Sequence, residues 1–282
     1  GDRVACVSKN RAEMVALHLG CARLGALFVP LNWRLSTAEI ARLIDDCEPA
    51  LVIGDEMATA LDVAALDINV LYDQCVGKMP LWLEEPSPEL PSLLLYTSGT
   101  TGNPKGVLLS EKNLAETAIN TSLLCEVEGS SGFLCEAPMF HIIGLVTSVR
   151  APLMRGGHIV VSDKFVPERT LARLSSPELG ITHYFCVPQM ALALRAVDGY
   201  EPQKLRGLKA LFTGGAPHPA AQIQAWLDDG IAIVDGYGMS EAGTVFGMPL
   251  DQQTIARKAG CVGTPTPKVK ARVVDDLGRP VA

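Results

Sequence analysis

Apolar and polar positions alternate along the start of the chain with two different periods. Apolar residues cluster in short runs at residues 3–8, 26–31 and 50–53, which predicts three buried strands. Between them, apolar side chains recur every three or four positions at residues 11–24 and 37–47, which predicts two helices. Strands that alternate with helices in this way favour a parallel sheet covered by helices.

Capping signals refine these boundaries. Ser36 and Glu39 form the S-x-x-E capping box in front of the second helix. Asn10 is expected to cap the first helix, because a short polar side chain can accept hydrogen bonds from the first free N–H groups. A weaker pattern predicts a helix at residues 57–65 and a strand at residues 69–72.

The same alternation continues through the rest of the chain. A proline-rich connector at residues 77–92 precedes two apolar runs, 93–96 and 107–109, and Ser110 is expected to cap the helix that follows. A second α/β half begins at about Gly129. Its predicted strands are 133–137, 158–162, 181–187, 208–213 and 231–235, and its predicted helices are 142–153, 166–174, 188–196 and 220–227.

The loop between the two apolar runs has the composition of a phosphate-binding loop. It combines threonine, serine and glycine with Lys105, so it offers hydroxyl donors, backbone freedom and a positive charge. A Walker A loop requires glycine directly before the lysine and Ser or Thr after it, whereas Pro104 and Gly106 flank Lys105. The alternative is an ordinary flexible hairpin loop. We predict a phosphate-binding loop in a strand–loop–strand context.

Composition and charge exclude several classes of protein. With 48% hydrophobic and 20% charged residues the chain is that of a globular protein, and its net charge of −7 argues against a nucleic-acid partner. None of the eight cysteines lies in a C-x-x-C pair and most have apolar neighbours, so we interpret them as reduced core residues. Without a secretory signal or a transmembrane segment in the sequence, a cytoplasmic protein is expected, and a homodimer stays open.

Two further glycine-containing turns follow predicted strands, where open α/β sheets bind ligands. The turns and the loop carry the motifs YTSGTTGNPKG, TGGAP and DGYGMSE. In this order and spacing, the motifs resemble the adenylate-forming (AMP-binding) superfamily, and among its members acyl- and aryl-CoA synthetases most. The resemblance covers the whole chain.

The resemblance implies a fold and a division of the chain. The fold class is α/β, with two similar helix-flanked, mostly parallel sheets packed together as αβαβα and the start of a β-barrel-like subdomain at the C-terminus. Residues 1–125 would form the first α/β subdomain with the phosphate-binding loop, residues 126–255 the second with the acyl and adenine site, and residues 256–282 the truncated barrel.

The resemblance also implies roles for the motif residues. The β- and γ-phosphates of ATP would be wrapped by Thr97, Ser98, Gly99, Thr100, Thr101, Gly102 and Lys105. Adenine and the acyl group would lie along Gly214, Gly215, Ala216 and Pro217, and the nucleotide site would continue with Asp235, Gly236, Tyr237, Gly238 and Ser240. Ser240 stands where the family usually has threonine, which keeps the hydroxyl. His141, Gly215 and Met239 would contact the acid.

Glu241 would hold Mg²⁺, since a carboxylate is the hard oxygen ligand that this ion prefers. Lys105 and Glu241 are therefore the expected catalytic residues. Three structural alternatives stay open: Glu241 as an acid in the first turn of a helix, Tyr237 as a core aromatic, and His141 as a structural histidine.

The implied reaction is acid–thiol ligation, in which ATP activates a carboxylic acid as an acyl-adenylate and coenzyme A accepts the acyl group. A carboxylate is already an anion at neutral pH and needs no general base, which agrees with the absence of a Gly-x-Ser-x-Gly motif. The alternatives are loading of a carrier-protein phosphopantetheine and a catalytically silent nucleotide- or acyl-binding relative. The mostly apolar segments near His141, 187–191 and 213–217 favour a fatty or aryl acid over a dicarboxylate.

The resemblance further implies that the ribose-binding aspartate, the hinge and the catalytic lysine of a small C-terminal domain lie beyond Ala282. We therefore expect residues 1–282 to be part of an N-terminal domain that, by itself, binds ATP weakly at best and does not turn over.

Overall fold

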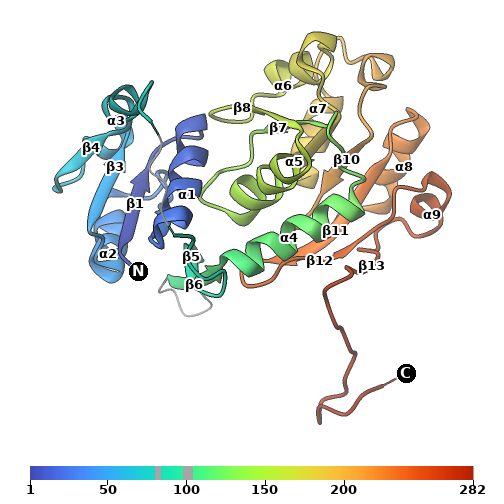
Figure 1. The fold of residues 1–282 in the computed structure, drawn as a ribbon. Coiled ribbons are helices and arrows are strands. Elements are labelled where there is room, and N and C mark those ends of the chain that lie inside the picture. Colours follow the sequence, from blue (N-terminus) through green and yellow to red (C-terminus); the bar gives the residue numbers. More distant parts are fainter. Residues whose placement is uncertain (80–83, 98–103, 282) are drawn as a thin grey trace.

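The computed structural model describes residues 1–79, 84–97 and 104–281, and within them two β-sheets are flanked by helices (Figure 1). In the first sheet the strands lie in the order β4-β3-β1-β2-β5-β6, and all neighbours are parallel except the β5–β6 hairpin. Its strands are β1 (Arg3–Val7), β2 (Leu27–Pro30), β3 (Leu51–Gly54), β4 (Ala65–Asp67), β5 (Pro91–Thr97) and β6 (Lys105–Ser110), and its connecting helices are α1 (Ala12–Leu24), α2 (Thr37–Cys47) and α3 (Ile68–Cys75).

The second sheet has the order β13-β12-β11-β10-β9-β7-β8, parallel from β8 to β11 and antiparallel from β11 to β13. Its strands are β7 (Gly132–Cys135), β8 (His158–Val161), β9 (His183–Cys186), β10 (Ala210–Thr213), β11 (Ile233–Met239), β12 (Gly243–Gly247) and β13 (Thr264–Pro265). The accompanying helices are α4 (Glu111–Leu124), α5 (Arg150–Arg155), α6 (Pro167–Leu174), α7 (Pro188–Arg195), α8 (Ala220–Asp228) and α9 (Gln252–Arg257).

Buried apolar side chains form a core on each side of the first sheet and a third around the second sheet. On the outer side, Ile40 and Leu43 of α2 pack on β1 and β2. On the inner side, α1, α4 and α5 lie between the two sheets, where Met14, Leu114 and Val149 join one cluster (Figure 1). This shared layer of helices fixes the two sheets relative to each other.

The prediction of a mixed α/β fold with two mostly parallel, helix-flanked sheets is confirmed. The capping box is present, since Ser36 accepts from the Glu39 N–H while the Glu39 side chain accepts from the Ser36 N–H. Ser110 caps α4 by accepting from the Asn113 N–H. The strand–loop–strand context is also confirmed, because Thr97 and Lys105 stand opposite each other in the antiparallel β5–β6 hairpin.

Two predictions between residues 57 and 72 are wrong. In place of a helix at 57–65 there is a short 3₁₀ turn, Glu56–Ala58, followed by β4. The segment 69–72, predicted as a strand, belongs to α3, because the Asp67 carboxylate accepts from the Asn69 and Val70 N–H groups and so starts a helix.

Asn10 does not cap α1, whose N-cap residue Arg11 makes no capping hydrogen bond through its side chain. The Asn10 amide instead donates to the Ala137 carbonyl at 2.8 Å and accepts from the Met139 N–H at 2.8 Å. The polar side chain thus joins the first sheet to the loop after β7, a role that no local pattern signals.

The segments 142–153 and 231–241 also differ from prediction. A π-helical turn, Ile143–Thr147, and α5 replace the single helix, because Pro152 has no N–H to donate to the Ser148 carbonyl. The strand predicted to end at residue 235 continues to Met239, because residues 236–239, predicted as part of a turn, pair with β12.

The segment after β13 runs away from the two sheets in Figure 1 and contains one isolated pairing, Val274 with Pro280. The start of a barrel in this segment stays a prediction. Among the described residues, no helix has the length and apolar character needed to cross a bilayer.

Candidate functional site

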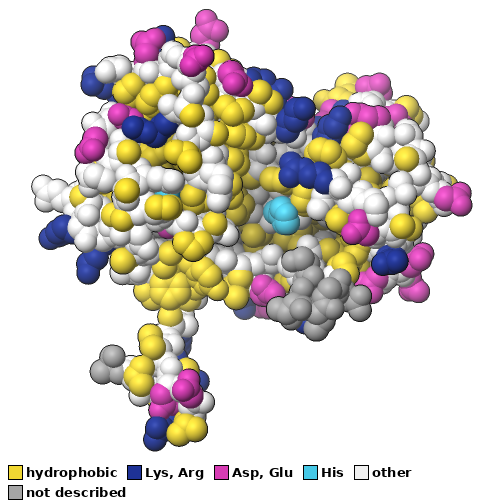
Figure 2. Space-filling model, turned by 180° about the vertical axis from the view of Figure 1, so that it is seen from behind, with side chains coloured by type: hydrophobic (Ala, Val, Ile, Leu, Met, Phe, Trp, Pro, Cys, Tyr) yellow, Lys and Arg dark blue, Asp and Glu magenta, His cyan; other side chains and the backbone are white. Residues whose placement is uncertain are grey.

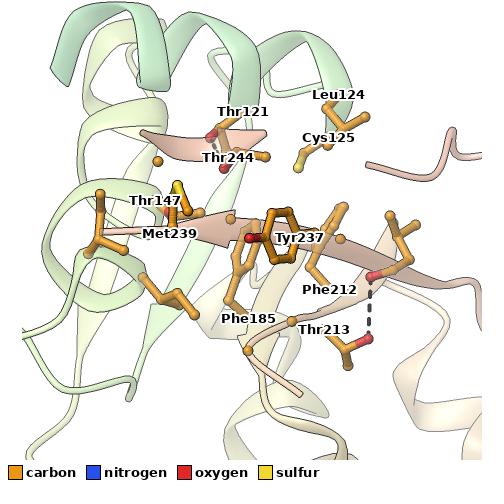
Figure 3. Close-up of a pocket in the computed structure, with 18 of the residues that line it drawn as sticks. Thr121, Leu124, Cys125, Thr147, Phe185, Phe212, Thr213, Tyr237, Met239 and Thr244 are labelled. Atoms are coloured by element: carbon orange, nitrogen blue, oxygen red, sulfur yellow. Dashed lines mark hydrogen bonds between the residues drawn. The ribbon is translucent and has the colours of Figure 1, made fainter. Parts of the chain in front are cut away.

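A pocket of about 240 Å³ opens at the carboxyl edge of the second sheet (Figure 3). Its walls come from α4, the π-helical turn and the ends of β9 to β12, and they are mostly apolar. Thr121 and Thr244 form a hydroxyl pair at 3.3 Å on one wall. Of the described residues that line the pocket, none carries a Lys, Arg, Asp or Glu side chain. The pocket therefore suits an apolar group.

Glycines bring the two turns of this edge together. Gly215 has a φ of +80°, a left-handed conformation that a side chain would strain. A Cβ atom on Gly214 would lie 3.1 Å from the Gly236 carbonyl oxygen, so the absence of a side chain lets the turn after β10 approach β11 closely. The pocket is consequently bordered by bare backbone on this side.

Tyr237 is a pocket residue with an exposed ring, and its interpretation as a core aromatic is wrong. Its side chain is 46% exposed, lies 6.3 Å from the ring of Phe246 and faces the pocket in Figure 3. Met239, two residues further along β11, is also exposed and lines the same wall. A flat ring beside glycine backbone makes a suitable platform for a planar ligand.

Glu241 lies exposed in the turn that connects β11 to β12. The alternative that Glu241 is an acid in the first turn of a helix is wrong, because β12 follows it. The β11–β12 hairpin packs on α4 so closely that a Cβ atom on Gly243 would lie 2.4 Å from the Thr117 hydroxyl oxygen. Ser240, next to Glu241, lines the pocket.

His141 lies on the surface where the π-helical turn begins, and it lines the pocket beside Phe140, at 4.7 Å between ring centroids. The face seen in Figure 2 is hollowed between the two halves of the molecule, with apolar side chains in the hollow and Lys or Arg side chains around it. The placement of His141 agrees with contact to a ligand, whereas a structural histidine would be buried.

Asp235 is 4% exposed and belongs to a buried polar chain behind the pocket wall. Its Oδ1 accepts from the Thr213 hydroxyl at 3.1 Å and from the Gly236 N–H at 3.1 Å, and the Thr213 hydroxyl also contacts Nδ1 of His218 at 3.0 Å. Burial raises the pKa of Asp235 and lowers the pKa of His218. No sequence pattern predicts a role for His218.

Thr97 and Lys105 are the last residue of β5 and the first of β6, so they form the pair next to the loop that connects the two strands of the hairpin. The Thr97 hydroxyl donates to the Lys105 carbonyl at 3.4 Å, and the Lys105 side chain is exposed. The other predicted phosphate contacts, Ser98, Gly99, Thr100, Thr101 and Gly102, lie outside the described residues. Strand β6 runs directly into α4, which connects the hairpin to the pocket.

The structure brings most predicted residues of the second half into one place. Those that line the pocket are His141, Gly214, Gly215, Gly236, Tyr237, Gly238, Met239 and Ser240. Ala216, Pro217, Asp235 and Glu241 neighbour these residues in the chain without lining the pocket.

The contribution of α4 to the pocket is not predictable from the motifs. Thr121, Leu124 and Cys125 line the pocket from a helix whose buried face also carries polar side chains, and these polar side chains were the only available signal. On the β9 side the wall consists of Phe185 and Cys186 in place of the expected residues 187–191.

Paired parallel sheets and a glycine-bordered apolar pocket at a carboxyl strand edge define a ligand-binding α/β protein. Over residues 1–282 the chain matches the family model described as "AMP-binding enzyme", and it belongs to that family. The resemblance found in the motifs is thereby confirmed.

Two curated relatives and one solved structure illustrate the similarity. The chain is 33% identical over 287 residues to a feruloyl-CoA synthase of Amycolatopsis sp, with 100% of this chain and 57% of the relative covered. It is 31% identical over 301 residues to an indoleacetate–CoA ligase of Aromatoleum aromaticum, covering 99% of this chain and 58% of the relative. The crystal structure of ATP-bound MatB from Rhodopseudomonas palustris superposes with a TM-score of 0.89 at 26% identity, covering 100% of this chain and 58% of that one.

The chain thus spans somewhat more than half the length of these relatives.

Proposed function

We propose that the protein carrying this chain is an acid–thiol ligase. ATP and a carboxylic acid would give an acyl-adenylate and pyrophosphate, and the thiol of coenzyme A would then take the acyl group and release AMP. The observation that carries this proposal is the apolar pocket bordered by glycine backbone and the Tyr237 ring, because it can hold an apolar acid beside a planar base. The similarity to a feruloyl-CoA synthase and to an indoleacetate–CoA ligase supports coenzyme A as the acceptor.

In this proposal the two glycine-rich regions have separate tasks. The β5–β6 hairpin, with Thr97 and Lys105, contacts the β- and γ-phosphates, where the lysine charge stabilises the departing pyrophosphate. The edge formed by Gly214, Gly215 and Tyr237 holds adenine. Asp235 lies just behind this edge, and its Oδ2, which has no partner among the described residues, would accept a hydrogen bond from the adenine amino group.

Glu241 is the proposed protein ligand of Mg²⁺. Among the described residues no group of three His, Cys, Asp or Glu side chains could hold a metal ion. A single exposed carboxylate nevertheless fits Mg²⁺, which commonly binds through one or two carboxylates together with substrate phosphates and water. When bound, the ion would neutralise phosphate charge, while Glu241 orients it from the turn after β11.

The proposed acid is a monocarboxylic acid with a fatty or aryl body. An acid with a second carboxylate would have to bury that charge, and the described lining offers it no Lys or Arg partner. The Thr121–Thr244 hydroxyl pair is the polar feature of the wall that α4 and β12 form, and it can hydrogen-bond only a neutral polar substituent without such a penalty.

We also propose that the protein works in the cytoplasm and divides into subdomains at about residues 125 and 255. Six of the eight free cysteines are buried, which is compatible with a reducing compartment. The first boundary would follow α4, and the second would fall within α9.

The proposal is tested by acid-dependent exchange of labelled pyrophosphate into ATP, measured on the complete protein with aryl, fatty and dicarboxylic acids. We expect exchange with aryl or fatty acids and at least tenfold slower exchange with dicarboxylates. Thr121→Phe should fill the pocket and lower kcat/KM for the acid about tenfold, whereas Leu123→Phe on the exposed face of α4 should have no effect. If none of the acids in the panel supports exchange, the proposed function is rejected. If dicarboxylates support faster exchange than aryl or fatty acids, the proposed substrate class is rejected.

A further inference from the structure

The side chains of Thr213 and Asp235, the first residues of two motifs, form a hydrogen-bonded chain with His218, which belongs to no motif. All three are nearly inaccessible, with exposures of 3%, 4% and 4%. Nδ1 of His218 lies 3.0 Å from the Thr213 hydroxyl oxygen, which lies 3.1 Å from Oδ1 of Asp235. Nε2 of His218 is buried and has no hydrogen-bond partner among the described residues.

The chain has a definite direction. The Thr213 hydroxyl carries one proton and has two candidate acceptors, the Asp235 carboxylate at 3.1 Å and the Val234 carbonyl at 3.5 Å. If the hydroxyl donated to Nδ1 instead, its oxygen would face the ionised Asp235 oxygen at 3.1 Å with no proton between them, so the histidine donates from Nδ1 to the hydroxyl oxygen. His218 is therefore the neutral tautomer protonated at Nδ1.

The donation from His218 constrains where the Thr213 proton points. A hydroxyl that accepts on one side turns its O–H away from that donor, and the carboxylate is the nearer acceptor of the two. Oδ1 of Asp235 is thereby held by Thr213 and by the Gly236 N–H. Among the described residues Oδ2 accepts no hydrogen bond, and unlike Nε2 of His218 it is not a fully buried atom, so Oδ2 is the oxygen of this carboxylate that a ligand can reach.

We propose that His218 is a positioning residue for nucleotide selection, which acts through Thr213 to fix the Asp235 carboxylate toward the 6-amino group of adenine. The inference rests on the proposed function, in which Asp235 contacts adenine. A carboxylate accepts hydrogen bonds and repels carbonyl oxygens, so a fixed Asp235 favours adenine over hypoxanthine, which has a 6-oxo group in place of the amino group.

The test compares ATP with inosine triphosphate as nucleotide in the exchange reaction and in calorimetric binding to the complete protein. The unmodified protein should prefer ATP at least tenfold. His218→Ala should lower kcat/KM for ATP about fivefold, the effect of one hydrogen bond, and leave the value for inosine triphosphate unchanged. His218→Asn, which places an N–H donor near the position of Nδ1, should restore the preference to within twofold.

Two control variants give the expected extremes of the ATP preference. Asp235→Ala should remove the preference entirely, and His158→Ala, at an exposed histidine on β8, should leave it intact. The inference is overturned if His218→Ala retains the ATP preference, if it weakens both nucleotides equally as a structural defect would, or if the unmodified protein does not discriminate. If no tested acid supports pyrophosphate exchange, the proposed function fails. The ratio of the dissociation constants for ATP and inosine triphosphate, measured by calorimetry, still decides the role of His218.

Discussion

Asp55 and Asp235 occupy comparable places in the two sheets and differ in what they do there. Each lies at the carboxyl edge of a parallel strand, β3 or β11, and each is nearly buried, with 7% and 4% exposure. Both oxygens of Asp55 are engaged, since Oδ2 accepts from the Ser8 hydroxyl and the Lys9 N–H and Oδ1 from the Met57 N–H. Asp235 has one engaged oxygen among the described residues.

The difference shows how similar edges acquire different uses. A hollow of about 160 Å³ also exists beside Asp55, but the carboxylate there is saturated by the chain itself and holds β1 against β3. At the second edge, glycine backbone and a half-satisfied carboxylate leave hydrogen-bonding capacity for a ligand. We infer that the first edge serves stability and the second serves binding.

Removing the two carboxylates should separate these roles most clearly. Asp55→Ala leaves three donors without their acceptor and should lower the free energy of unfolding by about 3 kcal/mol. Asp235→Ala should lower it by only about 1 kcal/mol, because it orphans the Gly236 N–H alone, while the Thr213 hydroxyl can still donate to the Val234 carbonyl. Urea denaturation of both variants measures the contrast, and equal losses would contradict it.

Lys105→Ala tests whether the first sheet contributes to catalysis through its hairpin. The loss of a charge that stabilises the leaving pyrophosphate should slow acyl-adenylate formation about a hundredfold. Binding of the acid should change less than twofold, since the pocket lies at the other sheet. Pre-steady-state adenylate formation and acid titration give the two values, with Lys112→Ala, an exposed lysine on α4, as the matched control. Equal exchange rates in the variant and the unmodified protein would count against the assignment.

Low pH should lower the folding stability of the protein through His183 in the second sheet. The ring of His183 stacks between Phe133 and Phe212 at centroid distances of 4.5 and 5.5 Å. Burial lowers the pKa of His183 from the ordinary 6.5 to about 4. The unfolded chain therefore takes up a proton below pH 6.5 while the folded protein does not, and the stabilisation present above that pH is lost as pH falls toward 4.

Between pH 7 and pH 5 this single group should cost about 2 kcal/mol of stability. The difference between the unmodified protein and His183→Gln in urea midpoints, measured across that range, isolates the contribution. An identical pH dependence in the two proteins would show that His183 is not responsible.

The local patterns that predicted the fold correctly share a physical origin. Ser36 and Ser110 cap helices through N–H groups three residues away, and the strand periodicity reports burial within a few residues. Such interactions are encoded by neighbours in the chain. The motifs likewise located the second-half residues around one pocket, because the carboxyl ends of parallel strands meet at one edge.

Predictions failed where a distant partner determined the outcome. The strand character of residues 236–239 depends on pairing with β12, and Asn10 binds the loop after β7 across more than a hundred residues of sequence. Thr121 and Phe185 line the same pocket only because α4 packs on β12 while β9 lies two strands away from β11 in the same sheet. Periodicity cannot report such contacts.

Local periodicity and contiguous motifs were sufficient to predict the fold class, the family and the position of the glycine-rich edge. Tertiary structure alone decided that the oxygens of Asp55 are saturated by Ser8, Lys9 and Met57, and that His218 reaches Asp235 through Thr213. The physical reason is that a hydrogen bond depends on the distance and direction between two groups in space, which neighbouring sequence does not specify.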